Sequence, residues 1–167
     1  GGRCMLTGNP LLKPETSRNS ELGFVLNGKQ WELSAVAFQN RIQDMIIAYY
    51  DAAAAKRRWV NIEQAKTRGL ELEGKWRLAP ALEVRGNYTR LIADGTDYSG
   101  KTITLEGRPD HMLHLNLLWQ INAPLSASFA AHYTGHQVYE SQQLGGYTRI
   151  DTGLQYRYSK ALQFRGG

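Results

Sequence analysis

The sequence predicts an all-β protein, specifically a transmembrane antiparallel β-barrel built as a meander of hairpins. Three observations predict this fold class. Apolar and polar residues alternate with a period of two, short turns alternate with long connections, and no run approaches the roughly 18 consecutive apolar residues of a transmembrane helix. With 167 residues, of which 42% are hydrophobic, the chain has enough apolar material for a packed or membrane-embedded structure. We expect seven or eight strands in one domain.

Alternation is clearest in TRGLELEGKWRL, residues 67–78, where the apolar side chains share one parity and the charged side chains take the other. The same pattern recurs in residues 82–89, 113–121, 125–134 and 150–158. These segments predict strands of about ten residues. The segment WELSAVAFQNRIQDMI, residues 31–46, is also predicted to be a strand, but its apolar run AVAF leaves open which parity faces which side.

The connections between the predicted strands alternate in length. Hairpin-sized, turn-rich stretches occupy residues 27–29, 79–80, 122–124 and 159–161. Long polar or small-residue connections occupy residues 51–66, 93–110 and 140–146. All short turns are therefore expected at one end of a sheet and all long loops at the other.

Large aromatic residues lie within a few residues of each short turn: Trp31, Trp76, Trp119 and Tyr158. Such a row at one level predicts the aromatic belt of a membrane interface, although core aromatics of a soluble sandwich are the alternative. Strands of about 9–11 residues are long enough to span a bilayer when tilted. The opposite parity carries Glu71, Glu73, Arg77 and Arg85, which suit a wet lumen, and wall salt bridges are the expected role of these charges.

Five motifs, in order along the chain, resemble the barrel of TonB-dependent outer-membrane receptors. They are GNPLLKPETSRNSELGF, VNIEQAKTRGLELEGKW, GNYTRLIAD, LEGRPDHMLHLNLLW and YTRIDTGLQYRY, and together they cover essentially the whole chain. The stretch GGRCMLTGN, with Cys4, is similar to a cysteine-bearing loop of catecholate siderophore receptors of the ferric enterobactin type. Cys4 is the only cysteine, so any disulfide needs a partner outside residues 1–167.

The resemblance implies a partial barrel in the bacterial outer membrane, taken from a larger barrel of the 22-stranded plugged class. It implies that residues 1–167 form the last third of one barrel domain, without the plug, the TonB-contacting motif or the final strand. A fragment of this kind leaves unpaired strand edges in lipid, so we expect it to be part of a longer polypeptide.

The implied function is TonB-dependent active uptake of a ferric siderophore, with a catecholate as the expected ligand. The expected partners are the ferric chelate, TonB through a segment outside this chain, and outer-membrane lipid or lipopolysaccharide. Haem or another nutrient as ligand, and a passive porin-like barrel or outer-membrane enzyme barrel, remain alternatives, as does a soluble ligand-binding barrel. The net charge of +5 favours anionic partners, but the basic residues are spread out, and we expect no nucleic acid.

The long connections carry the candidate ligand-binding residues. Lys56, Arg57 and Arg58 lie in one of them and Arg108 at the edge of another, where their charge suits an anionic ferric chelate or lipopolysaccharide phosphates; an ordinary solvated loop is the alternative. Tyr98 and Tyr139 are candidates for stacking on catechol or haem rings, with ordinary loop aromatics as the alternative, and Lys101 is a further candidate contact.

The stretch GTDYSGKT, residues 95–102, matches the phosphate-binding pattern G-x-x-x-x-G-K-[ST]. A phosphate-binding loop needs a buried apolar strand before it and a helix after it. Residues 82–91 alternate with charges instead, and residues 102–110 are β-branched and then broken by Gly107 and Pro109. We therefore expect the tip of an extracellular loop.

The four histidines give no metal site by their spacing along the chain. His132 and His136 share a face but lie about 13 Å apart on a strand, and His111 and His114 point to opposite faces. We expect no resident metal and no cofactor, iron being carried as a chelate; haem ligation by one histidine is the alternative. We also expect no enzyme, because the chain has no G-x-S-x-G motif and Cys4 has no basic partner nearby in sequence.

Overall fold

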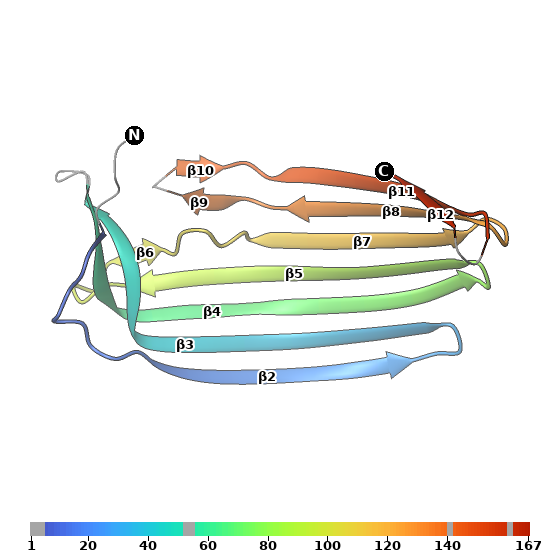
Figure 1. Ribbon diagram of the computed structural model, residues 1–167. Coiled ribbons are helices and arrows are strands. Elements are labelled where there is room, and N and C mark those ends of the chain that lie inside the picture. Colours follow the sequence, from blue (N-terminus) through green and yellow to red (C-terminus); the bar gives the residue numbers. More distant parts are fainter. Residues whose placement is uncertain (1–5, 52–55, 140–141, 160–161) are drawn as a thin grey trace.

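The computed structural model describes residues 6–51, 56–139, 142–159 and 162–167, and every regular element in these ranges is a β-strand (Figure 1). Within the described residues there is no helix long and apolar enough to cross a membrane. Cys4 and Lys160 lie outside the described ranges, as do residues 52–55 of the first predicted long connection.

Eight strands form one antiparallel meander in the spatial order β12-β11-β8-β7-β5-β4-β3-β2. Their bounds are β2 Thr16–Asn27, β3 Trp31–Asp51, β4 Lys56–Ala79, β5 Leu82–Thr96, β7 His111–Gln120, β8 Leu125–Thr134, β11 Tyr147–Arg157 and β12 Gln163–Gly166. The short connections between consecutive strands all lie at one end of the sheet, on the right in Figure 1. The predicted fold class, an antiparallel meander with seven or eight strands, is confirmed.

Four shorter strands accompany the meander. β1 (Leu6–Thr7) pairs in parallel with β4, and β6 (Thr102–Thr104) pairs with the end of β5. β9 (Gln137–Tyr139) and β10 (Gln142–Leu144) form a separate antiparallel hairpin. The predicted connections 93–110 and 140–146 therefore contain short strands of their own.

The strand lengths differ from the prediction of about ten residues. β7 and β8 have 10 residues each, but β3 has 21 and β4 has 24. The ladder between these two strands continues from Gln43, paired with Gln64, to Asp51, paired with Lys56. The prediction of a long connection over residues 51–66 was therefore wrong, because residues 45–50 (MIIAYY) and Val60 favour extended backbone and pair with one another.

The register settles the facing that the sequence left open for residues 31–46. Trp31 lies opposite Trp76, Leu33 opposite Gly74, and Ala35 opposite Leu72, and directly paired residues share a face of the sheet. The odd-numbered residues at the start of β3 therefore belong to the apolar face. The apolar parities of β4, β5, β7, β8 and β11 continue this face, through pairs such as Tyr88 with Leu113 and Leu117 with Phe129.

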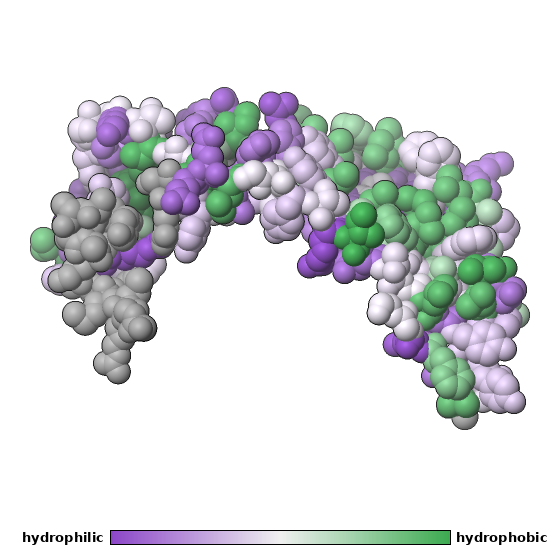
Figure 2. All heavy atoms as spheres, turned by 90° about the horizontal axis from the view of Figure 1, so that it is seen from above, coloured by the Kyte–Doolittle hydropathy of each residue, from purple (hydrophilic) through white to green (hydrophobic). Residues whose placement is uncertain are grey.

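The sheet does not close on itself within the described residues, since β2 and β12 form its two edges. Figure 2 shows an arch that is hollow on one side. Among the described residues the buried cluster is small, formed by Ile62, Ala65 and Leu105, and Ala35 is buried apart from it. Many large apolar side chains are exposed instead, among them Leu22 at 80%, which is the expected state of a barrel wall whose surroundings are lipid.

Gly69 on β4 lies in close contact with residues of both neighbouring strands, β3 and β5. Gly69 lies opposite Phe38, and a Cβ atom on Gly69 would stand 2.7 Å from Cζ of the Phe38 ring and closer still to the Arg90 carbonyl oxygen. The aromatic ring thus covers bare backbone on the polar face. A glycine is required at this position because no side chain fits beneath the ring.

Candidate functional site

The candidate ligand residues lie at the end of the sheet that carries the long connections, and we call this end the mouth. Arg57, at the start of β4, places its guanidinium carbon 5.7 Å from the ring centroid of Tyr139 at the end of β9. The two residues are 82 positions apart in sequence (139 − 57), yet the fold brings them together as a cation–π pair. Arg58 contacts a different ring, that of Tyr49, at 5.8 Å. The side chain of Lys56 lies outside the described part of the chain.

Tyr98 has contacts of its own at the mouth, although the residue is 54% exposed. Its hydroxyl donates a hydrogen bond to Oδ1 of Asp44, and Lys13 Nζ lies 5.1 Å from the centroid of its ring. This hydrogen bond to the carboxylate, followed by burial and by the negative charges of Asp44 and Glu63, raises the pKa of Tyr98. The contacts join the β5–β6 connection to β3 and to the segment before β2.

A polar cluster that the sequence did not predict holds this segment in place. The Asn61 amide nitrogen donates to the carbonyl oxygens of Lys13 at 3.0 Å and Asp44 at 2.6 Å, and its Oδ1 accepts from the Lys13 amide at 2.8 Å. Asp44 has a φ of 54°, a left-handed conformation that aspartate tolerates better than most residues. A single asparagine and a single aspartate in strand-like sequence carry no pattern that predicts such contacts.

The stretch GTDYSGKT forms a tight turn between two antiparallel strands. Asp97 Oδ1 accepts hydrogen bonds from Ser99 Oγ at 2.6 Å and from the amides of Ser99 and Lys101, both at 2.9 Å. The Ser99 hydroxyl, together with the two amides, holds the pKa of Asp97 below its usual value. β6 follows and pairs back onto β5, so the strand-then-helix context of a phosphate-binding loop is absent from the described residues, and Lys101 is an exposed loop residue.

Arg108 lines a hollow at the mouth with a volume of 370 Å³, where β5, β9 and the connection before β7 meet. Asp110 and His136 line the same hollow, and the Asp110 carboxylate lies 4.0 Å from His136 Nδ1 and 3.9 Å from His111 Nε2. The hollow is therefore lined by one guanidinium, one carboxylate and one imidazole, those of Arg108, Asp110 and His136. Of the seven candidates, Arg57 and Tyr139 contact each other, whereas Tyr98 contacts Asp44 and Lys13.

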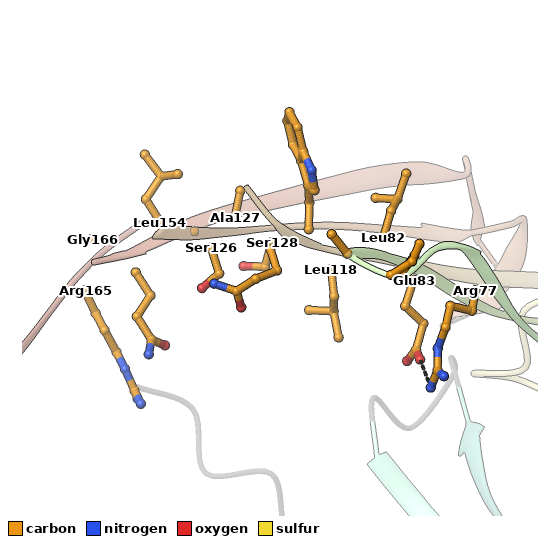
Figure 3. A pocket seen from close by; sticks show the side chains of 16 residues that line it. Arg77, Leu82, Glu83, Leu118, Ser126, Ala127, Ser128, Leu154, Arg165 and Gly166 are labelled. Atoms are coloured by element: carbon orange, nitrogen blue, oxygen red, sulfur yellow. Dashed lines mark ion pairs between the residues drawn. The ribbon is translucent and has the colours of Figure 1, made fainter. Parts of the chain in front are cut away.

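A larger hollow, of 730 Å³, lies at the short-turn end on the polar face (Figure 3). Ser126, Ser128, Glu83 and Arg165 point to this face, whereas Leu154 points to the other side of the sheet. Glu83 pairs with Arg85 Nε at 2.6 Å, Lys75 Nζ at 3.6 Å and Arg77 Nη2 at 3.9 Å. Wall salt bridges are thus present as expected, but Arg77 and Arg85 pair with Glu83 rather than with Glu71 or Glu73.

The four predicted interface aromatics lie beside the short connections and are all exposed. The exposed fractions are 43% for Trp31, 55% for Trp76, 47% for Trp119 and 71% for Tyr158. Trp31 and Trp76 face each other across β3 and β4. Their role at a membrane interface stays a prediction, one that this exposure favours over burial in a sandwich core.

The histidines form a pair that the sequence analysis missed. His114 on β7 lies directly opposite His132 on β8, and their Nδ1 atoms are 2.7 Å apart. Spacing along one strand does not reveal the pair, because the two histidines meet across neighbouring strands. The short turn at residues 122–124 fixes the hairpin register and was the signal from which the pair could have been found. Among the described residues no group of three or more potential ligands is arranged to hold a metal ion.

A family model described as "TonB dependent receptor-like, beta-barrel" matches residues 1–167. The chain is 31% identical to the iron-regulated outer membrane virulence protein of Vibrio cholerae over 171 residues, which cover 89% of the chain and 26% of that protein. It is 26% identical to the ferric enterobactin receptor PirA of Pseudomonas aeruginosa, covering 99% of the chain and 24% of that protein. The chain spans about a quarter of the length of these relatives.

The fold also matches solved structures. A Q482A mutant of the ferric enterobactin receptor of Pseudomonas aeruginosa, solved in complex with enterobactin, superposes with a TM-score of 0.70 and 27% identity, over 93% of the chain and 26% of that structure. The ferric yersiniabactin uptake receptor of Yersinia pestis gives a TM-score of 0.74 at 22% identity, over 90% of the chain and 24% of that structure, and shows likeness of fold alone.

Proposed function

Because the chain belongs to the TonB-dependent receptor β-barrel family, whose members lie in the bacterial outer membrane, we propose that it forms part of the wall of a receptor that imports a ferric siderophore. The relatives named as ferric enterobactin receptors favour a catecholate as the ligand. In this proposal the plug and the TonB-contacting motif belong to the rest of the polypeptide, and TonB supplies the energy for uptake. The role is transport, and we assign no catalytic residue.

The observation that carries the ligand class is the pairing of Arg57 with Tyr139 at the mouth. A ferric catecholate is anionic and presents aromatic rings, so it matches a guanidinium held beside a phenol ring. Arg108 adds a second cationic group in the neighbouring hollow. The apolar face with its exposed aromatics contacts outer-membrane lipid, and the lipopolysaccharide phosphates lie at the same end as the mouth.

The test uses the full-length receptor in a strain that lacks its own siderophore receptors and is starved of iron. We expect growth on a ferric catecholate and no growth when TonB is deleted. Growth on haem or a non-catecholate siderophore alone would contradict the ligand assignment. Growth that persists without TonB would contradict active import and favour a passive barrel.

Matched variants test the residues at the mouth. Arg57→Gln and Tyr139→Leu should each weaken binding of the ferric catecholate to whole cells by about two- to fivefold, the value of one exposed cation–π contact. Arg58→Gln is the matched control, because Arg58 lies over Tyr49 instead. If Arg57→Gln and Arg58→Gln weakened binding of the ferric catecholate equally, the positive charge of the mouth, and not the contact between Arg57 and Tyr139, would account for binding.

A further inference from the structure

Two imidazole rings meet on the polar face of the wall, where β7 and β8 run side by side. His114 and His132 are directly paired residues on neighbouring strands, with ring centroids 4.8 Å apart and ring planes at 80°. Their Nδ1 atoms are 2.7 Å apart, so the N–H of one ring donates a hydrogen bond to the Nδ1 lone pair of the other. The siderophore proposal does not use this pair.

The surroundings of His132 determine which ring donates. Asp151 Oδ2 on β11 lies 3.6 Å from Nε2 of His132, and Arg149 Nε holds the same oxygen at 3.1 Å. At 3.6 Å the carboxylate acts on Nε2 through its charge rather than through a direct hydrogen bond. Its negative charge favours the tautomer that carries the proton on Nε2, which leaves the Nδ1 lone pair of His132 directed at His114.

We propose that His114 and His132 form a binding site for a divalent transition-metal ion, with Cu²⁺ preferred, and that Asp151 is the positioning residue. Two imidazole nitrogens at about 2.0 Å from a metal are about 2.8 Å apart when adjacent in a square plane and about 3.3 Å apart in a tetrahedron. The observed 2.7 Å matches the square-planar separation, which Cu²⁺ and Ni²⁺ favour over Zn²⁺. Cu²⁺ also binds such ligands more tightly than Ni²⁺ does.

Metal binding needs one proton to move. The proton on Nδ1 of His114 shifts to Nε2 of the same ring through solvent, and both Nδ1 lone pairs then point at the ion, with no change in the number of protons bound. The His132 side chain is 26% exposed, so an ion can reach it. Water or groups from the remaining polypeptide complete the coordination. The site depends on the register between β7 and β8 and not on the identity of the transported ligand.

The first experiment uses the unaltered full-length receptor in detergent, titrated with Cu²⁺ alone. We expect one site whose pulsed EPR spectrum shows two equivalent imidazole nitrogens. Addition of ascorbate and peroxide should oxidise His114 and His132, which peptide mass mapping locates. A spectrum with one nitrogen, or oxidation confined to other histidines, would overturn the proposal whether or not siderophore uptake is observed.

Variants separate ligand from positioning residue. His114→Gln and His132→Gln should each abolish the two-nitrogen spectrum. Asp151→Asn should keep that spectrum but weaken Cu²⁺ binding by about 10- to 100-fold, the usual effect of losing a carboxylate partner. The double variant H111Q/H136Q leaves the pair intact and should bind Cu²⁺ as the unaltered protein does. If H111Q/H136Q lost Cu²⁺ binding, the assignment to His114 and His132 would be refuted. This outcome remains informative even if the His114 and His132 variants fail to fold.

Discussion

The wall formed by β7 and β8 and the mouth formed by the extended ends of β3, β4 and β5 are built by different physical rules. In the wall, each residue's neighbours follow from its parity and the hairpin register, as in the pairs Leu117–Phe129 and His114–His132. At the mouth, positions depend on side chains that bond to distant backbone, chiefly Asn61 with Lys13 and Asp44. A periodic pattern therefore predicts the wall, while the mouth depends on a few polar contacts.

The largest expected effect tests which face of the wall meets lipid. Leu115→Arg places a charge on the apolar face, and its cost at the bilayer midplane is about 2–4 kcal/mol of unfolding free energy. Asn116→Arg, one residue further along β7 on the polar face, is the matched control and should change stability little. Denaturant unfolding of the full-length receptor in lipid vesicles measures both. Equal costs would contradict the assignment of the two faces.

A smaller effect is expected where the wall leaves no room for a side chain. Gly69→Val forces the Phe38 ring and the Arg90 carbonyl to move and should cost about 1–3 kcal/mol of unfolding free energy, the usual range for overpacking. Gly145→Val is the control, since nothing lies within 4 Å of a Cβ atom there. The same unfolding measurement applies, and an unchanged midpoint for Gly69→Val would show that the ring does not cover this site.

At the mouth, loss of one polar side chain should act locally. Asn61→Ala removes three hydrogen bonds to residues 13 and 44, each worth about 1 kcal/mol. Hydrogen exchange should speed up at the amide of Lys13 while the amides of β7 and β8 stay protected. Asn116→Ala, a polar substitution in the wall, should leave Lys13 unaffected. Faster exchange throughout the sheet would mean that wall and mouth are one cooperative unit.

The smallest expected effect concerns the turn at Asp97. Its folded pKa lies below the ordinary value of 3.8, so the ionised carboxylate stabilises the turn above that pH, and this contribution is lost as the pH falls through the folded pKa. The amides of Ser99 and Lys101 should therefore exchange faster only in strong acid. Asp97→Asn should remove this pH dependence. A transition near neutral pH would instead implicate another group.

The difference between wall and mouth also explains what the sequence could and could not predict. Alternation predicted the antiparallel meander and the apolar parity of residues 67–78, because a half-buried strand must repeat every two residues. It did not predict that β3 and β4 run to Asp51 and from Lys56, since residues 45–50 (MIIAYY) carry apolar side chains on both parities and lack the alternation that marks the wall.

The sequence indicated which residues could belong to the candidate site, but not which of them contact one another. Arg57 and Tyr139 were each expected at the loop end, yet their contact depends on how the end of β4 approaches β9. Tyr98 was a candidate for stacking on the ligand, with an ordinary loop aromatic as the alternative, and the sequence did not predict that its hydroxyl donates to the carboxylate of Asp44. The histidine pair was predictable, because a four-residue connection between β7 and β8 fixes which residues are opposite.

The left-handed conformation at Asp44 interrupts pairing without shifting it. Gln43 stays opposite Gln64 and Met45 opposite Ile62, so the ladder resumes in the same register after one unpaired residue. The two strands can thus change direction at this point while every residue below it keeps its neighbour. Substitutions beyond Asp44 can therefore change the shape of the mouth while the paired residues on the other side of Asp44 keep their alignment.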